Sequence, residues 1–571
     1  LSVPNDPTVT RLSAADLQRY EATRMFIERA SAANDRFSIV DDDAAAITEI
    51  CRRLDGIPLA IELASARIAT LTVRQLHERL DDRFRILTGS GRTSIGRHRT
   101  LRALIDWSHD LLDEKERTLF RRLGTFVHGF TLDGAVAVAA GEVDESGVFD
   151  ALASLVDKSL VLAEAAGDAL RYRLLESTRL YACEKLAIAG EQKLAASRHL
   201  RFLRDRFAAL RAEAERIGRR VEINRAFSSE LDNVRSVLDT ASESSELLVA
   251  AELLAHMRDN WRFLDLRHEG MKRTERMLEL LPDSESQLIA LLAGSLSRLL
   301  YENGNNVRAF DVTNHALAHA RASGDIETIA LILCYHSYAA IADRKLDVAE
   351  VSLAEAEAYT GTSVGLDLRL LRGRATLQYV RGEIDSAIRT GEMLLRKCRS
   401  VGETDGGRQA ALNLARYEFA RGRTQRAREI ATVNLVACRV DSDWILPHTL
   451  LILAVCLAYE GDLAGAAASA GEATRLWADV EPDEPTTAAA ILVRAFIFAL
   501  RSHFVQAAML AGYAASVFAR YGSTLDAYEA MVQSRLTGIL RAGLPIELER
   551  LLAEGASLAP DAAIALALGE A

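Results

Sequence analysis

The segments YVRGEIDSAI (Tyr379–Ile388), FARGRTQRAR (Phe419–Arg428) and AYEGDLAGAA (Ala458–Ala467) share one pattern, in which a glycine is followed five positions later by an alanine. Glycine ends a helix readily because it adopts the left-handed cap conformation. A small alanine side chain on the inner face of the next helix lets the two helices approach closely. Each segment therefore predicts a helical hairpin with a tight turn.

The same pattern recurs throughout the second half of the chain. Successive turn positions lie 38 to 41 residues apart, and a fixed period of this size is typical of stacked helical repeats. Tyr301, Tyr379 and Phe419 each precede a turn by three positions, so we expect them to fill the hairpin cores. The turn and +5 residues are Asp265 with Gly270, Gly304 with Ala309, Arg344 with Ala349, Gly382 with Ala387, Gly422 with Ala427, Gly461 with Ala466, and Ser502 with Ala507.

These hairpins resemble tetratricopeptide repeats (TPR), although their period exceeds that family's usual period of about 34 residues. The sequence therefore predicts a mainly α protein in which residues 195–571 form a TPR-like α-solenoid. A final turn at Gly543, with Leu548 at the +5 position, predicts a degenerate capping unit.

The first 190 residues have a different organisation. A helical domain is predicted for residues 1–90, followed by the polar, glycine-rich linker GSGRTSIGRHR at 89–99. Residues 97–190 carry further helical patterns and two short alternating runs, 160–164 and 171–175, that indicate a β-hairpin. Helices around a β-hairpin predict a winged-helix domain.

Composition limits the classes of function. The net charge of −11 argues against broad binding to a phosphate backbone. The six cysteines contain no CxxC pair and complete no zinc pattern with histidine. No signal peptide and no apolar run of about 18 residues is present. We therefore expect a cytoplasmic protein that contacts no membrane.

Several motifs in the first half carry a family resemblance. They are YEATRMFIERA from Tyr20, ICRRLDGIPLAIELASAR from Ile50, RHRTLRALIDWSHDLL from Arg97, LVDKSL from Leu155 and YRLLESTRLYA from Tyr172. Together they resemble the helical lid and winged helix of bacterial signalling ATPases of the STAND class, which includes the NB-ARC ATPases and AfsR- and LuxR-like transcriptional regulators. The resemblance implies a helical lid, a winged helix and helical repeats in that order, and a switch that depends on ATP or ADP.

The resemblance also implies candidate nucleotide contacts. Gly56 and Pro58 match the Gly-x-Pro of the lid, which packs against adenine in that family. His98 or Arg99 could contact phosphate. The alternative interpretation is that Gly56 ends one helix and Pro58 begins the next, and that His98 and Arg99 are solvated linker residues.

Two departures from the family limit its catalytic implications. The chain contains no Gly-Lys dipeptide and therefore no Walker A loop to hold phosphates, so we expect no enzymatic activity and weak or no ATP or ADP binding by these 571 residues. The run IVDDD at Ile39–Asp43 is better explained by Asp43 as a helix N-cap than by a Walker B strand. The chain starts at Leu1 rather than Met, and we expect the phosphate-binding half and any output domain upstream of it.

The second departure concerns ADP sensing. Leu174, Leu175 and Glu176 stand where NB-ARC relatives often have Met-His-Asp. Leucine cannot donate a hydrogen bond to phosphate. Sensing of ADP at this position is therefore not expected.

The sequence favours a regulatory function in which the repeats bind a protein or small-molecule inducer. The family is also compatible with self-assembly on activation. We expect no direct DNA binding, because the helix before the wing is apolar and acidic. Two alternatives are a TPR-like adaptor without nucleotide binding and the regulatory half of a nucleotide cyclase. We expect partners to bind the extended concave surface formed by the first helices of the hairpins. The alternative is that residues such as Trp261 and Tyr335 fill hairpin cores. The candidate partner-binding residues, all before hairpin turns, are Trp261, Arg262, Tyr335, His336, Arg416 and Tyr417.

Overall fold

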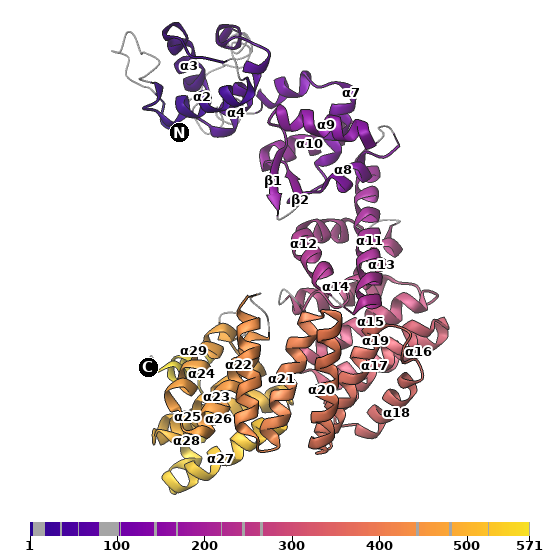
Figure 1. The fold of residues 1–571 in the computed structure, drawn as a ribbon, viewed down its shortest axis with the longest axis vertical. Helices are drawn as coiled ribbons and strands as arrows, with labels where there is room; N and C mark the ends of the chain where they lie inside the picture. The colour runs from indigo at the N-terminus through magenta and orange to yellow at the C-terminus, as the bar shows by residue number, and fades with distance from the viewer. Residues whose placement is uncertain are drawn as a thin grey trace. The chain divides into compact units, whose positions relative to one another are not determined.

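The computed structural model describes most of the chain: residues 1–3, 17–34, 37–54, 56–78, 102, 104–141, 145–166, 169–218, 220–241, 246–262, 266–440, 445–478, 482–523 and 525–569. The described residues form two compact units (Figure 1). Unit 1 comprises residues 1–203 and 230–246, and unit 2 comprises 204–229 and 247–571. No helix in the described ranges is long and apolar enough to cross a membrane.

Unit 1 begins with short helices around an apolar core. They are α2 (Glu21–Ala33), α3 (Asp41–Arg53), α4 (Pro58–Ser65) and the 3-10 helix η1 (Ala66–Ala69). α3 starts at Asp41 with Val40 as its N-cap, so the prediction that Asp43 caps this helix is wrong. The predicted boundary between the lid and the winged helix, at residues 90–97, lies outside the described residues and stays a prediction.

The winged helix follows these short helices within unit 1. Its elements are α7 (Glu114–Leu123), α8 (Leu132–Ala139), α9 (Glu145–Asp157), β1 (Leu162–Ala166), β2 (Ala169–Arg173) and α10 (Glu176–Ile188). The antiparallel hairpin pairs Leu162 with Arg173. Both strands are therefore shifted by two residues toward the turn, compared with the predicted ranges. The shift arises because Leu160 and Val161 are buried in the core before pairing begins.

Unit 2 is a stack of antiparallel helix pairs, as predicted for a TPR-like solenoid (Figure 1). In each pair the first helix also packs against the first helix of the next pair, which produces an inner layer and an outer layer. The unit boundary falls within α11 (Gln192–Ile217) and α12 (Val221–Ala241). The remaining helices are α13 (Leu247–His256), α14 (Arg267–Leu280), α15 (Ser286–Glu302), α16 (Asn306–Ser323), α17 (Ile326–Ala342), α18 (Leu346–Glu357), α19 (Val364–Val380), α20 (Ile384–Val401), α21 (Thr404–Ala420), α22 (Thr424–Val440), α23 (Leu446–Glu460), α24 (Leu463–Ala478), α25 (Pro485–Leu500), α26 (Phe504–Tyr521), α27 (Ala527–Gly543), α28 (Leu548–Ala556) and α29 (Pro560–Leu568).

The hairpin turns confirm the predicted register. Six of the seven predicted turn positions have a positive φ, including the two non-glycine residues Arg344 (59°) and Ser502 (65°). The seventh, Asp265, lies outside the described residues. All seven +5 residues are buried, and the six alanines among them have 0% exposure. The close approach expected from small side chains at this position is therefore confirmed.

A network of buried charges joins the first helices of unit 2 to its middle. The Arg369 guanidinium on α19 donates to both Glu215 carboxylate oxygens on α11, at 2.6 and 2.8 Å. Asp259 lies 3.1 Å from Arg211 and accepts a hydrogen bond from the Tyr335 hydroxyl at 2.9 Å. Burial raises the pKa of Asp259, but the surrounding arginines outweigh it and hold that pKa well below its usual value. The carboxylate is therefore ionised and essential to the balance of charge.

The left-handed turns generate a stability prediction. Ser502→Gly should raise stability by about 1 kcal/mol, because glycine adopts a positive φ without a Cβ clash. Gly382→Ser should lower the stability by about the same amount, because φ is 81° at this position. No atom lies within 4 Å of an added Cβ, so the loss would come from the backbone conformation alone. Thermal unfolding followed by circular dichroism measures both shifts. Equal shifts of the same sign would contradict the explanation.

The buried network generates a second prediction. Asp259→Asn should destabilise the protein by about 3–5 kcal/mol at pH 7, because it leaves the Arg211 and Arg369 charges buried with too little compensation. Glu429→Gln, at an exposed pair with Arg426, should cost less than about 1 kcal/mol. Because the pKa of Asp259 is lowered in the folded state, its contribution is present above the unfolded pKa and is lost as the pH falls through the folded pKa. Urea titrations at pH 7 and at acidic pH should show the difference shrinking in acid.

Candidate functional site

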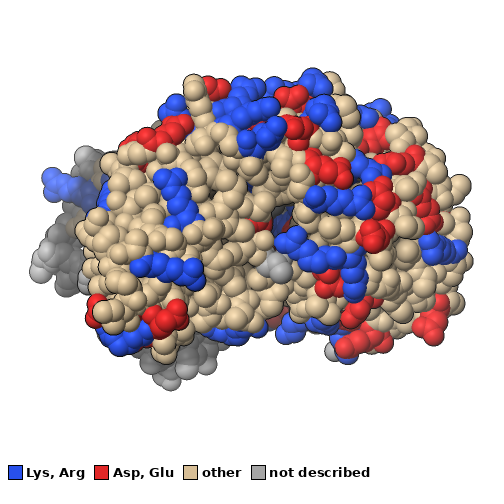
Figure 2. Space-filling view, turned by 90° about the horizontal axis from the view of Figure 1, so that it is seen from below, with Lys and Arg blue, Asp and Glu red and all other residues tan. Residues whose placement is uncertain are grey.

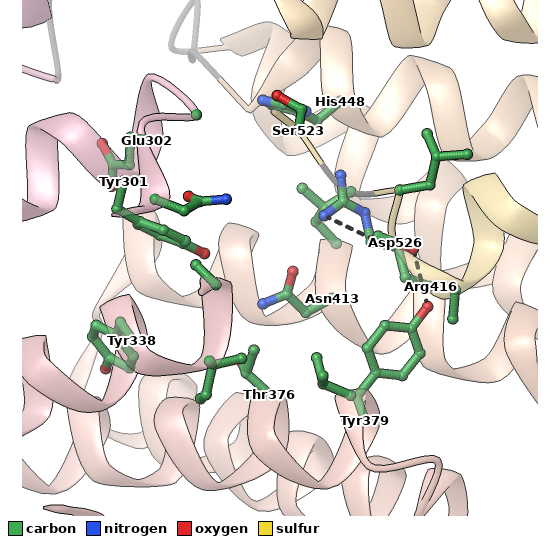
Figure 3. A pocket seen from close by; sticks show the side chains of 18 of the residues that line it. Tyr301, Glu302, Tyr338, Thr376, Tyr379, Asn413, Arg416, His448, Ser523 and Asp526 are labelled. Carbon is green, nitrogen blue, oxygen red and sulfur yellow. Dashed lines mark hydrogen bonds and ion pairs between the residues drawn. The ribbon is translucent and has the colours of Figure 1, made fainter. Parts of the chain in front are cut away.

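A cavity of about 580 Å³ lies within unit 2, along the inner layer of helices. Its lining comes from the ends of α15, α17 and α19, from α21 and α23, and from the segment between α26 and α27. Figure 3 shows Tyr301 and Asn413 directed toward the open centre, and the Tyr379 hydroxyl directed toward Asp526. In the view from below, Lys and Arg side chains border a hollow near the middle of the face (Figure 2).

The repeat register explains how these side chains reach one place. The residue six positions before the turn lines the cavity in four successive hairpins. Because inner helices pack side by side in the same orientation, equivalent positions form a continuous stripe. These residues are Arg298, Tyr338, Thr376 and Arg416.

The far end of the chain closes one side of the cavity. The Tyr379 hydroxyl donates to Asp526 at 3.2 Å, across 147 residues of sequence. Arg344 donates to the Leu525 carbonyl at 3.3 Å. The segment between α26 and α27 therefore lies against the turns of hairpins much earlier in the chain.

Charge in the cavity is dominated by arginine. Five arginines line it, against the two carboxylates Glu302 and Asp526. Glu302 is already paired with Arg262 at 2.6 Å and Arg298 at 3.1 Å. Arg416 lies 3.9 Å from Asp526 and 5.3 Å from the centre of the Tyr528 ring. Burial lowers the pKa of Arg416, but these neighbours raise it by more. The net effect is a raised pKa, so the guanidinium stays charged.

Several buried polar atoms of the lining have no hydrogen-bond partner among the described residues. They are Nε of Arg298, Arg372 and Arg416, Oε1 of Gln409, and the hydroxyls of Thr486 and Ser523. Buried polar groups are paired in the great majority of cases. Their concentration around one cavity shows that the polar groups of this lining are incompletely satisfied by internal partners.

Two of the six predicted partner-binding residues line this cavity. Arg416 contributes its guanidinium, and the Tyr417 ring lies 4.6 Å, centre to centre, from the Tyr379 ring, tilted by 37°. Tyr301, which we expected in a hairpin core, is 37% exposed and lines the cavity instead. Phe419 occupies the core as expected, at 1% exposure.

The other four predicted residues are interior, so the expectation that they form an open surface is wrong. Trp261 is fully buried and packs edge-on against Phe227 at 5.1 Å. Tyr335 is 2% exposed and binds Asp259 in the charge network. Some aromatic and polar residues of the inner helices pack against neighbouring hairpins, and others face the concave side. The sequence pattern did not distinguish these two environments.

Arg262 and His336 are buried for the same reason. Arg262 is 9% exposed and pairs with Glu302. The two ring nitrogens of His336 lie 2.8 Å from Ser352 Oγ and 3.0 Å from Asn314 Oδ1. Both side chains satisfy internal partners and cannot be replaced without structural cost.

The predicted nucleotide contacts lie in unit 1. Gly56 is buried with φ of 64° and follows α3, whereas Pro58 is exposed at the first turn of α4. Helix capping accounts for both positions, so a nucleotide contact stays a prediction. His98 and Arg99 lie outside the described residues. No cluster of potential metal ligands occurs among the residues that were described.

The exposed charges of α9 are acidic, and the arginines of the wing are paired. On α9 the exposed charged residues are Glu145, Asp150 and Asp157. Lys158, just after α9, lies 2.5 Å from Glu116. On the wing, Arg171 pairs with Glu230 at 2.8 Å and Arg173 pairs with Glu164 at 2.6 Å.

Comparisons with known proteins agree with this architecture. Residues 112–187 match the model of the winged helix-turn-helix domain. A protein of Mycobacterium tuberculosis named as an HTH-type transcriptional regulator is 40% identical over 317 residues, which are 53% of this chain and 35% of that protein. An uncharacterised protein of the same species is 42% identical over 194 residues, 34% of this chain and 49% of that protein. The chain thus spans about a third to a half of the length of these relatives.

Solved structures that align with this chain are more distant in sequence. A STAND protein with a tetratricopeptide repeat sensor from Pyrococcus horikoshii aligns with a TM-score of 0.46 and 14% identity, covering 92% of this chain and 73% of that chain. A Rap protein complexed with Competence and Sporulation Factor aligns with a TM-score of 0.42 and 13% identity, covering 62% of this chain and 99% of that chain. The winged-helix match and the sequence relatives support the general statement that this chain contains a winged helix and is similar to HTH-type transcription regulators.

Proposed function

We propose that this chain is the sensing and relaying part of a STAND-type transcription regulator. In this proposal the cavity of unit 2 binds an effector, and the lid and winged helix of unit 1 couple that event to a nucleotide-dependent switch. The cavity is the observation that carries the proposal. Its volume lies in the range of small-molecule sites, about 300–1,000 Å³, and its lining combines tyrosine rings with unpaired buried polar atoms.

The nucleotide part of the proposal rests on the resemblance of the lid motifs. Support comes from Pro58, whose ring is exposed at the start of α4 and has no N–H to satisfy. The residues of this chain supply no phosphate loop. Any binding by these residues alone should therefore be weak and without hydrolysis.

A repeat adaptor without nucleotide binding is the second candidate function. The observation in its favour is that helix capping explains Gly56 and Pro58 without a ligand. The two candidates differ in whether adenine nucleotides affect the response to an effector. They share the effector cavity.

The winged helix generates a prediction about DNA. We expect no sequence-selective binding of duplex DNA by this chain at physiological salt, because the exposed charges of α9 are acidic and the wing arginines are paired. Fluorescence anisotropy with promoter-length duplexes at 150 mM salt measures this. A selective complex abolished by Arg171→Ala would show the wing to be a DNA reader.

The cavity generates a prediction about effectors. A panel of sugars, amino acids, organic acids, phosphorylated metabolites and short peptides should contain at least one compound that raises the melting temperature of the chain. Asn413→Trp fills the centre of the cavity and should abolish that shift. Gln425→Trp, on the exposed first turn of α22, is the matched control and should preserve it.

A stabilising compound whose shift survives Asn413→Trp binds elsewhere, and the cavity is then not the sensor site.

A further inference from the structure

The cavity carries a more specific inference, which rests on the proposed sensing function. We propose that the effector is a small organic anion and that Arg372 binds its carboxylate or phosphate group. Arg372 lies on α19, lines the cavity and is 8% exposed.

Arg372 differs from the other buried arginines of unit 2 in its partners. Arg369 binds Glu215 through two hydrogen bonds. Arg494 donates to the carbonyls of Ala567 at 2.6 Å and Ala467 at 2.9 Å. Within the described ranges, no carboxylate lies within 4 Å of the Arg372 guanidinium, and the guanidinium donates no hydrogen bond to any described residue. The Nε atom of Arg372 is fully buried.

A buried cation without an acceptor is costly to a folded protein. Burial lowers the pKa of Arg372 to about 10, the Tyr338 hydroxyl opposes this effect, and the nearby Arg298 adds to it. At neutral pH the side chain is still a cation. An anion in the cavity would provide the missing acceptors with bidentate geometry, which a planar guanidinium favours for carboxylate and phosphate.

The rest of the lining is also complementary to an anion. The unpaired atoms are mostly donors: Nε of Arg416 and the hydroxyls of Ser523 and Thr486. The carboxylates that could repel an anion are engaged, Glu302 by two arginines and Asp526 by Arg416 and Tyr379. The local charge therefore favours a negative ligand.

Cavity size and tyrosine content favour an organic anion over a bare ion. A volume of about 580 Å³ accommodates a carbon skeleton as well as a charged group. Rings that can pack against this skeleton come from Tyr301, Tyr338, Tyr379 and Tyr417.

The test uses the full 571-residue chain and two pairs of probes at constant ionic strength. Succinate with succinamide tests carboxylate, and glucose 6-phosphate with glucose tests phosphate. Each probe is titrated to 50 mM by calorimetry and by thermal unfolding. At least one anion should bind and raise the melting temperature, whereas its neutral partner should not, and the pair that responds identifies the charged group.

Two variants locate the site. Arg372→Gln should weaken binding of the responding anion at least tenfold, and Arg396→Gln, an exposed arginine on α20 paired with Glu392, should leave it unchanged. Arg372→Gln should also keep or raise the melting temperature of the protein without probe, because it removes an uncompensated buried charge. A structural arginine would give the opposite shift.

Three results would overturn the inference: no binding of either anion at 50 mM, binding that Arg372→Gln leaves intact, or a lower melting temperature of Arg372→Gln without probe. Failure of the inference is distinguishable from failure of the proposed function. A neutral effector that is lost in Asn413→Trp but retained in Arg372→Gln would leave sensing in place and remove only its anionic specificity.

Discussion

The bidentate pair between Arg369 and Glu215 is the interaction on which the arrangement of unit 2 most depends. Contacts in a helical solenoid are mostly between neighbouring hairpins, so small variations in each neighbour contact add up between distant repeats. The pair crosses 154 residues and fixes α11 against α19. Asp259 extends it to Arg211, which is also on α11, and to Tyr335 on α17. Buried ion pairs add little net stability but penalise arrangements that separate them, so this network specifies one packing of the early repeats.

A second long-range constraint acts at the other end of the stack. Asp526 and Leu525 meet Tyr379 and Arg344 across the inner surface. Local packing would leave the concave side an open groove, whereas this contact encloses part of it as a cavity. Enclosure explains the unusual electrostatics, because an arginine on an open groove would be solvated and Arg372 is not.

The repeat fold could be predicted from sequence because its determinants are local. A left-handed turn and a small residue five positions later define each hairpin, and the register identified Arg344 and Ser502 as turns although neither is glycine. One stripe of the cavity lining could also be predicted, since the position six residues before each turn recurs along the inner helices and includes Arg298 and Arg416. The rest could not. Asp526 reaches the site through tertiary closure, and the importance of Arg372 depends on which partners the folded chain fails to provide. The burial of Trp261 similarly depends on Phe227, which no repeat position indicates.

The cavity adjoins the charge network at Arg298, and in the proposed sensing function this contact would give ligand binding a physical route to α11. Arg298 lines the cavity, pairs with Glu302 and lies 5.8 Å from the centre of the Tyr335 ring. The Tyr335 hydroxyl binds Asp259, which pairs with Arg211 on α11. α11 is one continuous helix from Gln192 to Ile217, so its first half belongs to unit 1 and its second half to unit 2. A ligand that draws Arg298 toward an anionic group changes the charge facing Tyr335, and any adjustment of Asp259 acts directly on Arg211. In the proposed sensing function, groups that are buried and tightly paired in this way would exchange between discrete arrangements rather than deform gradually, which is the property that a sensor coupled to a switch requires.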